Sequence, residues 1–552
     1  MNKLFRRLCL VLLLVSFLPL SAGVNLKNGN YYVSYTDHKL GTSKAPLKSI
    51  VRTYNSKSVG VGLFGYGWGS DIETRLKAYP DGFIIVQENG LGGSTYFVPL
   101  ISDESLKEFM IDMIVDTAIE QGDLKNNPSA ILQYRESMAD WEKRASKWDL
   151  YVKKGLLEYE TSFIEDMEWH SNQRGNQVIK FNGSTFLRKG NKADDTFNLN
   201  GQLTRIDYGN GIYSVIEYEN SRIRKISNSE GSVYTLETNS DGLIIKIISP
   251  DGESSYKYSG NDLIETSDTL GNIYLHQYDT NHNMTQINYQ DDSKYMIEYY
   301  PGTQFVKQTT SRTGEVTDYE YGKYFKEDGS VDKDHYSTSV YRTDEYTGEP
   351  YLSNYVEYII GTRPSGKRYT AMVKTIRNGI ETTTLYDDLC DNVKKITRGV
   401  RTTTFEYNNR CLMTRKDRGD GDVIELDYHP DFDKITRVTE YGITTTFNYD
   451  QKGNLIEADI NTGEWLKLEY DDKSQILVMR QKDRTLNFEY NEYGKPVRII
   501  MEGKGSIDVT YDSNGEIDKV NSESGHKMAL EVTSAFQSML AIVKPAGVDL
   551  GL

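Results

Sequence analysis

Residues 443–456 have the sequence ITTTFNYDQKGNLI, and this stretch decides the fold. Up to Tyr449 its apolar residues alternate with Thr and Asn, which predicts a strand with one face against a core, because successive side chains of a strand point to opposite faces. Asp450 and Gly453 then mark a turn. Leu455 begins a second apolar segment, so the stretch is predicted to be a β-hairpin.

The tyrosine that ends this strand recurs along the chain at separations of 21, 21, 21, 21, 20 and 21 residues, in the order Tyr386, Tyr407, Tyr428, Tyr449, Tyr470, Tyr490 and Tyr511. An earlier series has a similar spacing: Phe197, Tyr218, Thr238, Tyr258, Tyr278 and Tyr299. Each repeat has room for two short strands and two turns. The periodicity therefore predicts a mainly β fold in which tandem hairpins form one antiparallel sheet. A wide sheet of twisted strands must coil or close, so a curved, spiralling, barrel-like wall is expected.

The length and composition agree with such an array. The chain has 552 residues, which is too long for one compact core. It contains 41 Tyr and 46 Gly, residues that favour half-buried strands and tight turns respectively. Its net charge of −16 repels phosphate backbones, which argues against a nucleic-acid partner and against anionic glycans.

The N-terminus has the pattern of a signal peptide. Lys3, Arg6 and Arg7 precede a short apolar run from Leu8 to Leu18, and Leu20-Ser21-Ala22 resembles a cleavage site. We therefore expect residues 1–22 to be removed and Gly23 to begin the mature chain. The expected locations are the periplasm, the cell surface or the exterior. No later apolar stretch is long enough to cross a membrane.

Two segments lack the strand pattern. Residues 101–155 are predicted to form an inserted helical hairpin, whose first helix has Ser102 as N-cap and whose second helix follows Asn127-Pro128 and ends near Gly155. Residues 521–552 are predicted to contain an amphipathic helix, which Lys544-Pro545 ends. Its apolar stripe consists of Met528, Val532, Ala535, Phe536, Met539, Leu540 and Val543. Such a helix either plugs the repeat shell or binds a partner through Phe536, Met539 and Leu540.

The hairpin unit resembles the YD repeat of the Rhs and teneurin-like families. Residues Tyr449-Asp450-Gln451-Lys452-Gly453-Asn454 carry the resemblance, which extends over residues 190–520. The segments Arg52-Thr53-Tyr54-Asn55-Ser56 and Phe64-Gly65-Tyr66-Gly67-Trp68-Gly69-Ser70 resemble the domain that precedes YD repeats in secreted Rhs proteins. Residues 23–100 are accordingly expected to form that β domain and residues 156–520 the YD shell. Gly65, Gly67 and Trp68 then either seal the start of the shell or hold a ligand.

Catalytic patterns are not recognisable in the sequence. The seven histidines have no metal-ligand spacing, and no nucleophile elbow or phosphate-binding loop occurs. Rhs toxins carry an Asp-Pro self-cleavage motif and a toxic domain; neither is recognised here. We therefore expect a non-enzymatic structural or interaction protein of the cell envelope or exterior, without a cofactor. The alternatives are a module that binds neutral carbohydrate through exposed Tyr, and a hydrolase with unidentified carboxylates.

Cys390 and Cys411 each lie four residues after an anchor tyrosine. Matching turns of adjacent hairpins are two strands apart, which is about 9–10 Å at ordinary strand spacing. A disulfide needs Cα atoms closer than about 7 Å. Two free or only locally strained thiols are therefore predicted.

Overall fold

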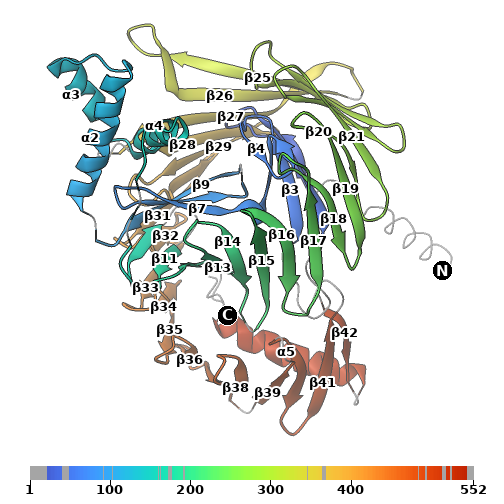
Figure 1. Cartoon of the computed structure of the whole chain (residues 1–552). Coiled ribbons are helices and arrows are strands. Elements are labelled where there is room, and N and C mark those ends of the chain that lie inside the picture. Colours follow the sequence, from blue (N-terminus) through green and yellow to red (C-terminus); the bar gives the residue numbers. More distant parts are fainter. Residues whose placement is uncertain are drawn as a thin grey trace. The chain divides into compact units, whose positions relative to one another are not determined.

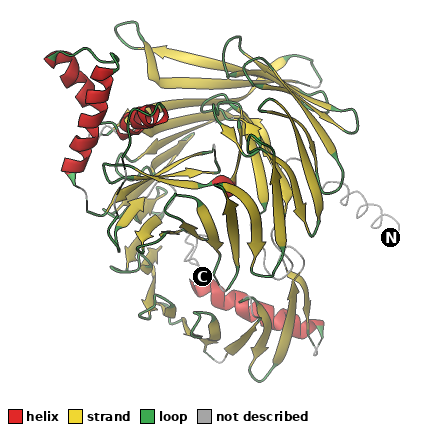
Figure 2. Cartoon of the chain, viewed as in Figure 1, coloured by secondary structure: helices red, strands yellow, loops and turns green. Residues whose placement is uncertain are grey.

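The computed structural model describes residues 21–39, 49–90, 92–101, 103–159, 161, 163–171, 177–190, 193–209, 211–344, 346–363, 368–482, 484–491, 494–511, 517–522 and 525–543. The predicted signal peptide thus lies almost wholly outside the described residues. The chain forms two compact units: unit 2 contains residues 370–552 and the short segments 41–46 and 209–212, and unit 1 contains the remainder up to Tyr369. Strands account for 54% of the residues and helices for 11%, which confirms the mainly β prediction (Figure 2).

The N-terminal segment expected to be one β domain contributes to three different sheets. One sheet has the strand order β1 (Ser21–Val24), β2 (Tyr31–His38), β3 (Ile50–Asn55) and β6 (Trp68–Ser70), and it is called the N-terminal sheet below. The ribbon of β4 (Val61–Gly62) and β5 (Gly65–Tyr66) and the 3₁₀ turn η1 (Asp71–Glu73) flank β6. Strands β7 (Arg75–Ala78), β8 (Ile84–Glu88) and β9 (Gly93–Pro99) join the repeat sheet instead, because β9 pairs with β10.

In unit 1 each strand from β10 to β27 pairs antiparallel with the next, as a tandem hairpin array requires. The strands are β10 (Glu168–Ser171), β11 (Gln177–Phe181), β12 (Phe186–Lys189), β13 (Asp194–Phe197), β14 (Leu203–Asp207), β15 (Tyr213–Glu219), β16 (Arg222–Asn228), β17 (Val233–Thr238), β18 (Ile244–Ser249), β19 (Gly252–Ser259), β20 (Asp262–Ser267), β21 (Ile273–Tyr278), β22 (Met284–Tyr289), β23 (Lys294–Tyr299), β24 (Val306–Thr310), β25 (Val316–Phe325), β26 (Val331–Thr343) and β27 (Pro350–Thr362).

Unit 2 is also built of tandem antiparallel hairpins, and it ends in a helix. Its elements are β28 (Arg368–Arg377), β29 (Ile380–Tyr386), β30 (Val393–Arg398), β31 (Arg401–Tyr407), β32 (Met413–Asp417), β33 (Val423–Tyr428), β34 (Ile435–Glu440), β35 (Ile443–Tyr449), β36 (Leu455–Ile460), β37 (Trp465–Tyr470), β38 (Ile476–Gln481), β39 (Arg484–Tyr490), β40 (Pro496–Met501), β41 (Gly505–Tyr511), β42 (Ile517–Asn521) and α5 (His526–Val543). The predicted C-terminal helix is thus confirmed.

Many repeats share one local geometry at the anchor tyrosine, which the repeat at Tyr449 illustrates. The strand register shifts immediately before Tyr449, which leaves a β-bulge there, and Tyr449 pairs with Leu455 across the turn. The Asp450 carboxylate closes that turn by accepting hydrogen bonds from the backbone N–H groups of Lys452 and Asn454, both at 2.8 Å. The Tyr–Asp pair of the repeat is therefore a strand terminator followed by a turn cap.

The tyrosine hydroxyls connect successive repeats. The Tyr449 hydroxyl donates to the carbonyl of Ile435, the residue that pairs with the preceding anchor Tyr428. Ten anchor tyrosines and Tyr321 on β25 make this bond at 2.6–3.0 Å: Tyr218, Tyr258, Tyr278, Tyr299, Tyr321, Tyr407, Tyr428, Tyr449, Tyr470, Tyr490 and Tyr511. We call this series the tyrosine ladder. It explains why the hydroxyl, and not only the ring, recurs with the period.

The inserted helical segment contains three helices instead of the predicted two: α2 (Glu104–Glu120), α3 (Pro128–Ser137) and α4 (Trp141–Lys153). The predicted second helix breaks because Asp140 is a new N-cap that accepts from the N–H of Lys143. The buried Arg144 side chain donates to the carbonyls of Met138 and Ala139, which the break exposes. Arg144 also pairs with Asp81 at 2.8 Å, so the break is part of the tertiary packing.

The prediction of free thiols is wrong, because Cys390 and Cys411 form a disulfide with Cα atoms 5.4 Å apart. The two turns do not match. Cys411 has a positive φ of 62°, whereas the positive φ of the other turn, 58°, belongs to Asp391. The turn after Tyr386 is one residue longer, since Tyr386 pairs with Val393 but Tyr407 pairs with Met413. Because of this extra residue, the distance between the Cα atoms of Cys390 and Cys411 cannot be calculated from the spacing of the strands alone.

Replacing Tyr449 with Phe tests the ladder, since it removes one hydroxyl and keeps the ring. We expect the free energy of unfolding to fall by about 1 kcal/mol, the usual value of a net hydrogen bond. Tyr449→Ala, which also removes the ring, should cost about 3 kcal/mol. Urea denaturation measures both, with Tyr346→Phe as control because Tyr346 is 97% exposed. Equal effects at Tyr449 and Tyr346 would refute a stabilising role for the hydroxyl.

Thiol counting tests the disulfide. The chain from Gly23 onward has two cysteines, and we expect no free thiol under denaturing, non-reducing conditions and two after reduction. Because the bond closes a loop across 21 residues, its reduction should lower the free energy of unfolding by about 3 kcal/mol. Cys390→Ser should show one free thiol and the same loss of stability; two free thiols in the unreduced parent chain would contradict the structure.

Candidate functional site

The N-terminal sheet packs against the repeats of unit 1, which curve around it (Figure 1). Backbone hydrogen bonds join the two: the N–H of Ile244 donates to the carbonyl of Leu63 at 2.8 Å, and that of Val306 to the carbonyl of Gly29 at 2.9 Å. The Tyr54 hydroxyl accepts from the N–H of Met284 at 2.9 Å. The first part of the chain is therefore bonded to repeats that follow it by about two hundred residues.

Trp68, which the sequence singles out, lies at the centre of this contact. Its side chain is fully buried, and its indole N–H donates to the Tyr278 hydroxyl at 3.0 Å. The rings of Tyr35, Tyr54 and His276 lie within 5.5–6.2 Å of the Trp68 ring, centroid to centroid. Trp68 therefore packs the N-terminal sheet onto the repeats.

The two neighbouring glycines allow a close approach of backbone and ring. Gly67 has a φ of 76°, and a Cβ atom there would lie 2.8 Å from the Tyr54 ring. Gly65 has a φ of 104°, and a Cβ atom would lie 2.5 Å from the carbonyl oxygen of Asn261. Any other residue at either position would strain the backbone and separate the sheet from the repeats.

An ion pair lies beside Trp68. The guanidinium of Arg52 binds the carboxylate of Asp37 at 2.9 Å, and both side chains are almost completely buried. The Asp37 carboxylate also accepts from the Tyr256 hydroxyl at 2.9 Å, and Arg52 donates to the Thr266 hydroxyl at 3.2 Å. Burial raises the pKa of Asp37, although Arg52 opposes this rise. A buried pair of this kind is costly if either partner is lost, since the remaining charge is then uncompensated.

The helix residues proposed as a possible partner surface pack within unit 2. Met539 is fully buried in a cluster with the strand residues Leu466 and Leu486. Phe536 is half-buried and its ring lies 5.8 Å from the ring of Phe488. The side chain of Leu540 lies outside the described residues. The apolar stripe of α5 thus covers the sheet of its own unit.

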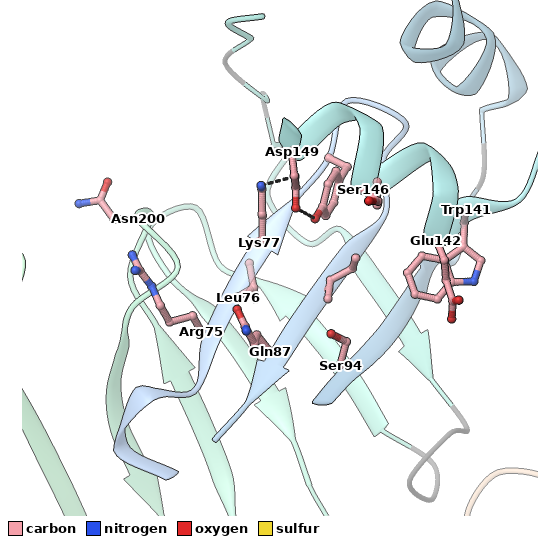
Figure 3. Close-up of a pocket in the computed structure, with 13 residues that line it drawn as sticks. Arg75, Leu76, Lys77, Gln87, Ser94, Trp141, Glu142, Ser146, Asp149 and Asn200 are labelled. Carbon is pink, nitrogen blue, oxygen red and sulfur yellow. Dashed lines mark hydrogen bonds and ion pairs between the residues drawn. The ribbon is translucent and has the colours of Figure 1, made fainter. Parts of the chain in front are cut away.

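A pocket that the sequence does not reveal lies on unit 1, between helix α4 and the outward face of β7–β9 (Figure 3). We call it the α4 pocket. Its volume is about 660 Å³, and its lining includes Arg75, Gln87, Ser94, Trp141, Glu142 and Asn200. In the sequence, the alternation of exposed residues along β7 and β8 indicates the strands that form the floor of the pocket. No pattern indicates its wall, because helix α4 belongs to an insertion with its own packing.

The charges of the α4 pocket are partly paired. Lys77 forms an ion pair with Asp149, which also accepts a hydrogen bond from the Tyr79 hydroxyl at 3.1 Å (Figure 3). Arg75 and Glu142 supply one further charge of each sign. No group of three or more potential metal ligands occurs among the residues that the structure describes. Among these residues we also find no helix with the length and apolar character of a membrane span.

The buried histidines give the contact between the N-terminal sheet and the repeats a pH dependence. Burial lowers the pKa of His38 to about 4 and that of His276 to about 3, from 6.5 for a free histidine. As the pH falls, the histidines of the unfolded chain therefore bind protons at a higher pH than those of the folded chain. The free energy of unfolding is unaffected by these histidines above pH 6.5. Below pH 6.5 each histidine lowers it by about 1.4 kcal/mol per pH unit, until the pKa of that histidine in the folded chain is reached.

Thermal unfolding between pH 7.5 and 4.5 measures this dependence. We expect a falling melting temperature and a shallower slope for His38→Asn and His276→Asn than for the parent chain. His170→Asn, at a half-exposed side chain on β10, is the control. If all three variants kept the parent slope, other groups would account for the acid sensitivity.

Comparisons with known proteins agree with the repeat geometry. Residues 432–549 match the family model described as teneurin YD-shell, and residues 21–92 match a domain of unknown function (DUF6531). A search of the curated proteins found no match.

Three solved structures similar to this chain contain TccC3. The chain has 11% identity to the crystal structure of TcdB2-TccC3-TEV, with a TM-score of 0.40 over 97% of this chain and 29% of the other. The crystal structure of TcdB2-TccC3 has 12% identity to this chain and a TM-score of 0.40, over 66% of this chain and 23% of the other. The structure of the Tc holotoxin pore of Photorhabdus luminescens has 10% identity and a TM-score of 0.24, over 96% of this chain and 38% of the other. This chain thus spans less than a third of the length of the first structure.

The match to the teneurin YD-shell covers the last repeats and α5. The repeats before it have the same bulge, capped turn and tyrosine ladder, for example at Tyr278 and Asp279. The chain is therefore similar to the teneurin YD-shell over residues 432–549, and the repeats before them share the local geometry of these last repeats.

Proposed function

We propose that this chain is an exported YD-repeat shell that acts as a non-enzymatic interaction protein of the cell envelope or exterior. The observation that carries the proposal is that the chain itself covers the apolar faces of many of its repeats. The N-terminal sheet covers repeats of unit 1, and α5 covers repeats of unit 2. Among the described residues, the surfaces open to a partner include the outward face of the repeats and the helical insertion.

The outward face of the repeats of unit 2 carries solvated charge pairs. Lys467 binds Glu457 at 2.9 Å, and Arg480 binds Glu469 at 2.5 Å, with every side chain at least 30% exposed. Exposed pairs of this kind contribute little to stability and keep a sheet surface soluble. The helical insertion differs from this pattern, because it adds the α4 pocket and exposed apolar side chains such as Leu132.

Export is supported by the pattern of residues 1–22. The proposal predicts that the chain is recovered outside the cytoplasm with Gly23 as its N-terminal residue, which fractionation and N-terminal sequencing measure. Replacing Leu12 and Leu13 with Arg should retain the chain inside the cell, whereas replacing Asn2 with Ser should not. Recovery of the parent chain in the cytoplasm would contradict export.

Photocrosslinking in the native envelope tests the interaction role. A crosslinker at Leu132 on α3, which is 58% exposed, should give a discrete adduct with one partner, whereas a crosslinker at the buried Val438 should not. The result that overturns the proposal is turnover of a substrate by the purified chain that a single Asp or Glu replacement abolishes.

A further inference from the structure

We propose that the α4 pocket binds the end of a neutral glycan. This inference rests on the proposed interaction role and names the chemistry of one ligand. It depends on three features of the pocket: a polar floor, a supported aromatic wall and balanced charges. Its volume of about 660 Å³ lies in the usual range for small-molecule sites.

The floor is a row of polar side chains across three strands. Arg75 on β7 pairs with Gln87 on β8, and Gln87 pairs with Ser94 on β9. Residues directly opposite in adjacent strands project to the same face, so the three side chains lie side by side, and all three are exposed (Figure 3). The next row, Lys77–Ile85–Tyr96, is partly covered by the helical insertion.

The wall of the pocket is an aromatic platform. Trp141, the first residue of α4, stacks on Tyr96 with ring centroids 3.6 Å apart and an angle of 20° between the planes. Tyr96 in turn stacks on Phe83 at 5.0 Å. This stack holds the Trp141 ring beside the polar row. The C–H face of a sugar ring packs on such a surface, while its hydroxyls remain free to form hydrogen bonds.

The polar groups suit hydroxyls better than a charged ligand. Arg75 only donates hydrogen bonds and Glu142 only accepts them, while Gln87, Ser94 and Asn200 do both. A sugar hydroxyl also donates and accepts, so it can satisfy every one of these groups. Lys77 is already paired with Asp149, and the charges of Arg75 and Glu142 cancel. The site therefore has no net charge to attract a phosphate, a sulfate or a polyamine, and its exposed floor is too polar for an apolar ligand.

Two variants test the site without loss of the fold. Ser94→Trp fills the pocket from an exposed position, and Gln87→Ala removes the centre of the polar row. Trp141→Ala removes the wall, but it also unstacks Tyr96, so its result counts only if the circular dichroism spectrum is unchanged. Arg224→Ala is the matched control, because Arg224 is an exposed arginine on β16 outside the pocket lining.

The purified exported chain is applied to an array of neutral oligosaccharides, and cellotriose, maltotriose and chitotriose are titrated by calorimetry. We expect saturable binding of at least one trisaccharide at millimolar concentration or below. Ser94→Trp and Gln87→Ala should weaken it at least tenfold, and Arg224→Ala should leave it unchanged.

Three results would overturn the assignment: no binding of any neutral glycan, binding that Ser94→Trp leaves intact, or binding of peptides only. The photocrosslinking experiment separates these failures from a failure of the proposed function. If the Leu132 adduct forms while glycan binding is absent, the interaction role stands and the glycan is wrong.

Discussion

The hydrogen bond from an anchor tyrosine to the repeat before it, which recurs along the tyrosine ladder, is the interaction on which the rest of the structure depends. A β-bulge ends the strand at Tyr449 and an Asp-capped turn follows, so the hydroxyl reaches the carbonyl of Ile435. One such bond contributes little free energy. Repeated through the array, it sets the position of each hairpin on its neighbour, and stability becomes a sum of nearly identical interfaces.

The array leaves an apolar face that must be covered, and the two units cover it differently. Unit 1 uses a second sheet with a buried ion pair between Arg52 and Asp37, which adds polar specificity to the apolar contact. Unit 2 uses the apolar stripe of one helix, through residues such as Val532 and Met539. The first contact requires a particular arrangement of partners, whereas the second requires mainly shape and volume.

Local patterns predicted the fold to the extent that its interactions are local. The period of the tyrosines and the alternation around Tyr470 gave the hairpins and their buried faces, because neighbouring repeats pack only on each other. The break before Trp141 was missed, since Arg144 stabilises it through Asp81, which lies far away in sequence. The disulfide was missed because one added residue changes the turn at Cys390. The α4 pocket needs Arg75 and Trp141 together, and no spacing rule joins them.

The covered face of unit 1 has a consequence for the order in which the chain matures. Arg52 forms a hydrogen bond with Thr266, which follows it by 214 residues, and Tyr54 forms one with Met284, which follows it by 230 residues. A chain that emerges from its N-terminus therefore presents Trp68 and its charged neighbours before anything exists to shield them. Each later repeat closes on a neighbour already made, within about twenty residues. The apolar residues of the N-terminal segment therefore stay exposed for longer than those of any later repeat, so a chaperone that holds unfolded chains would find its binding sequence in this segment.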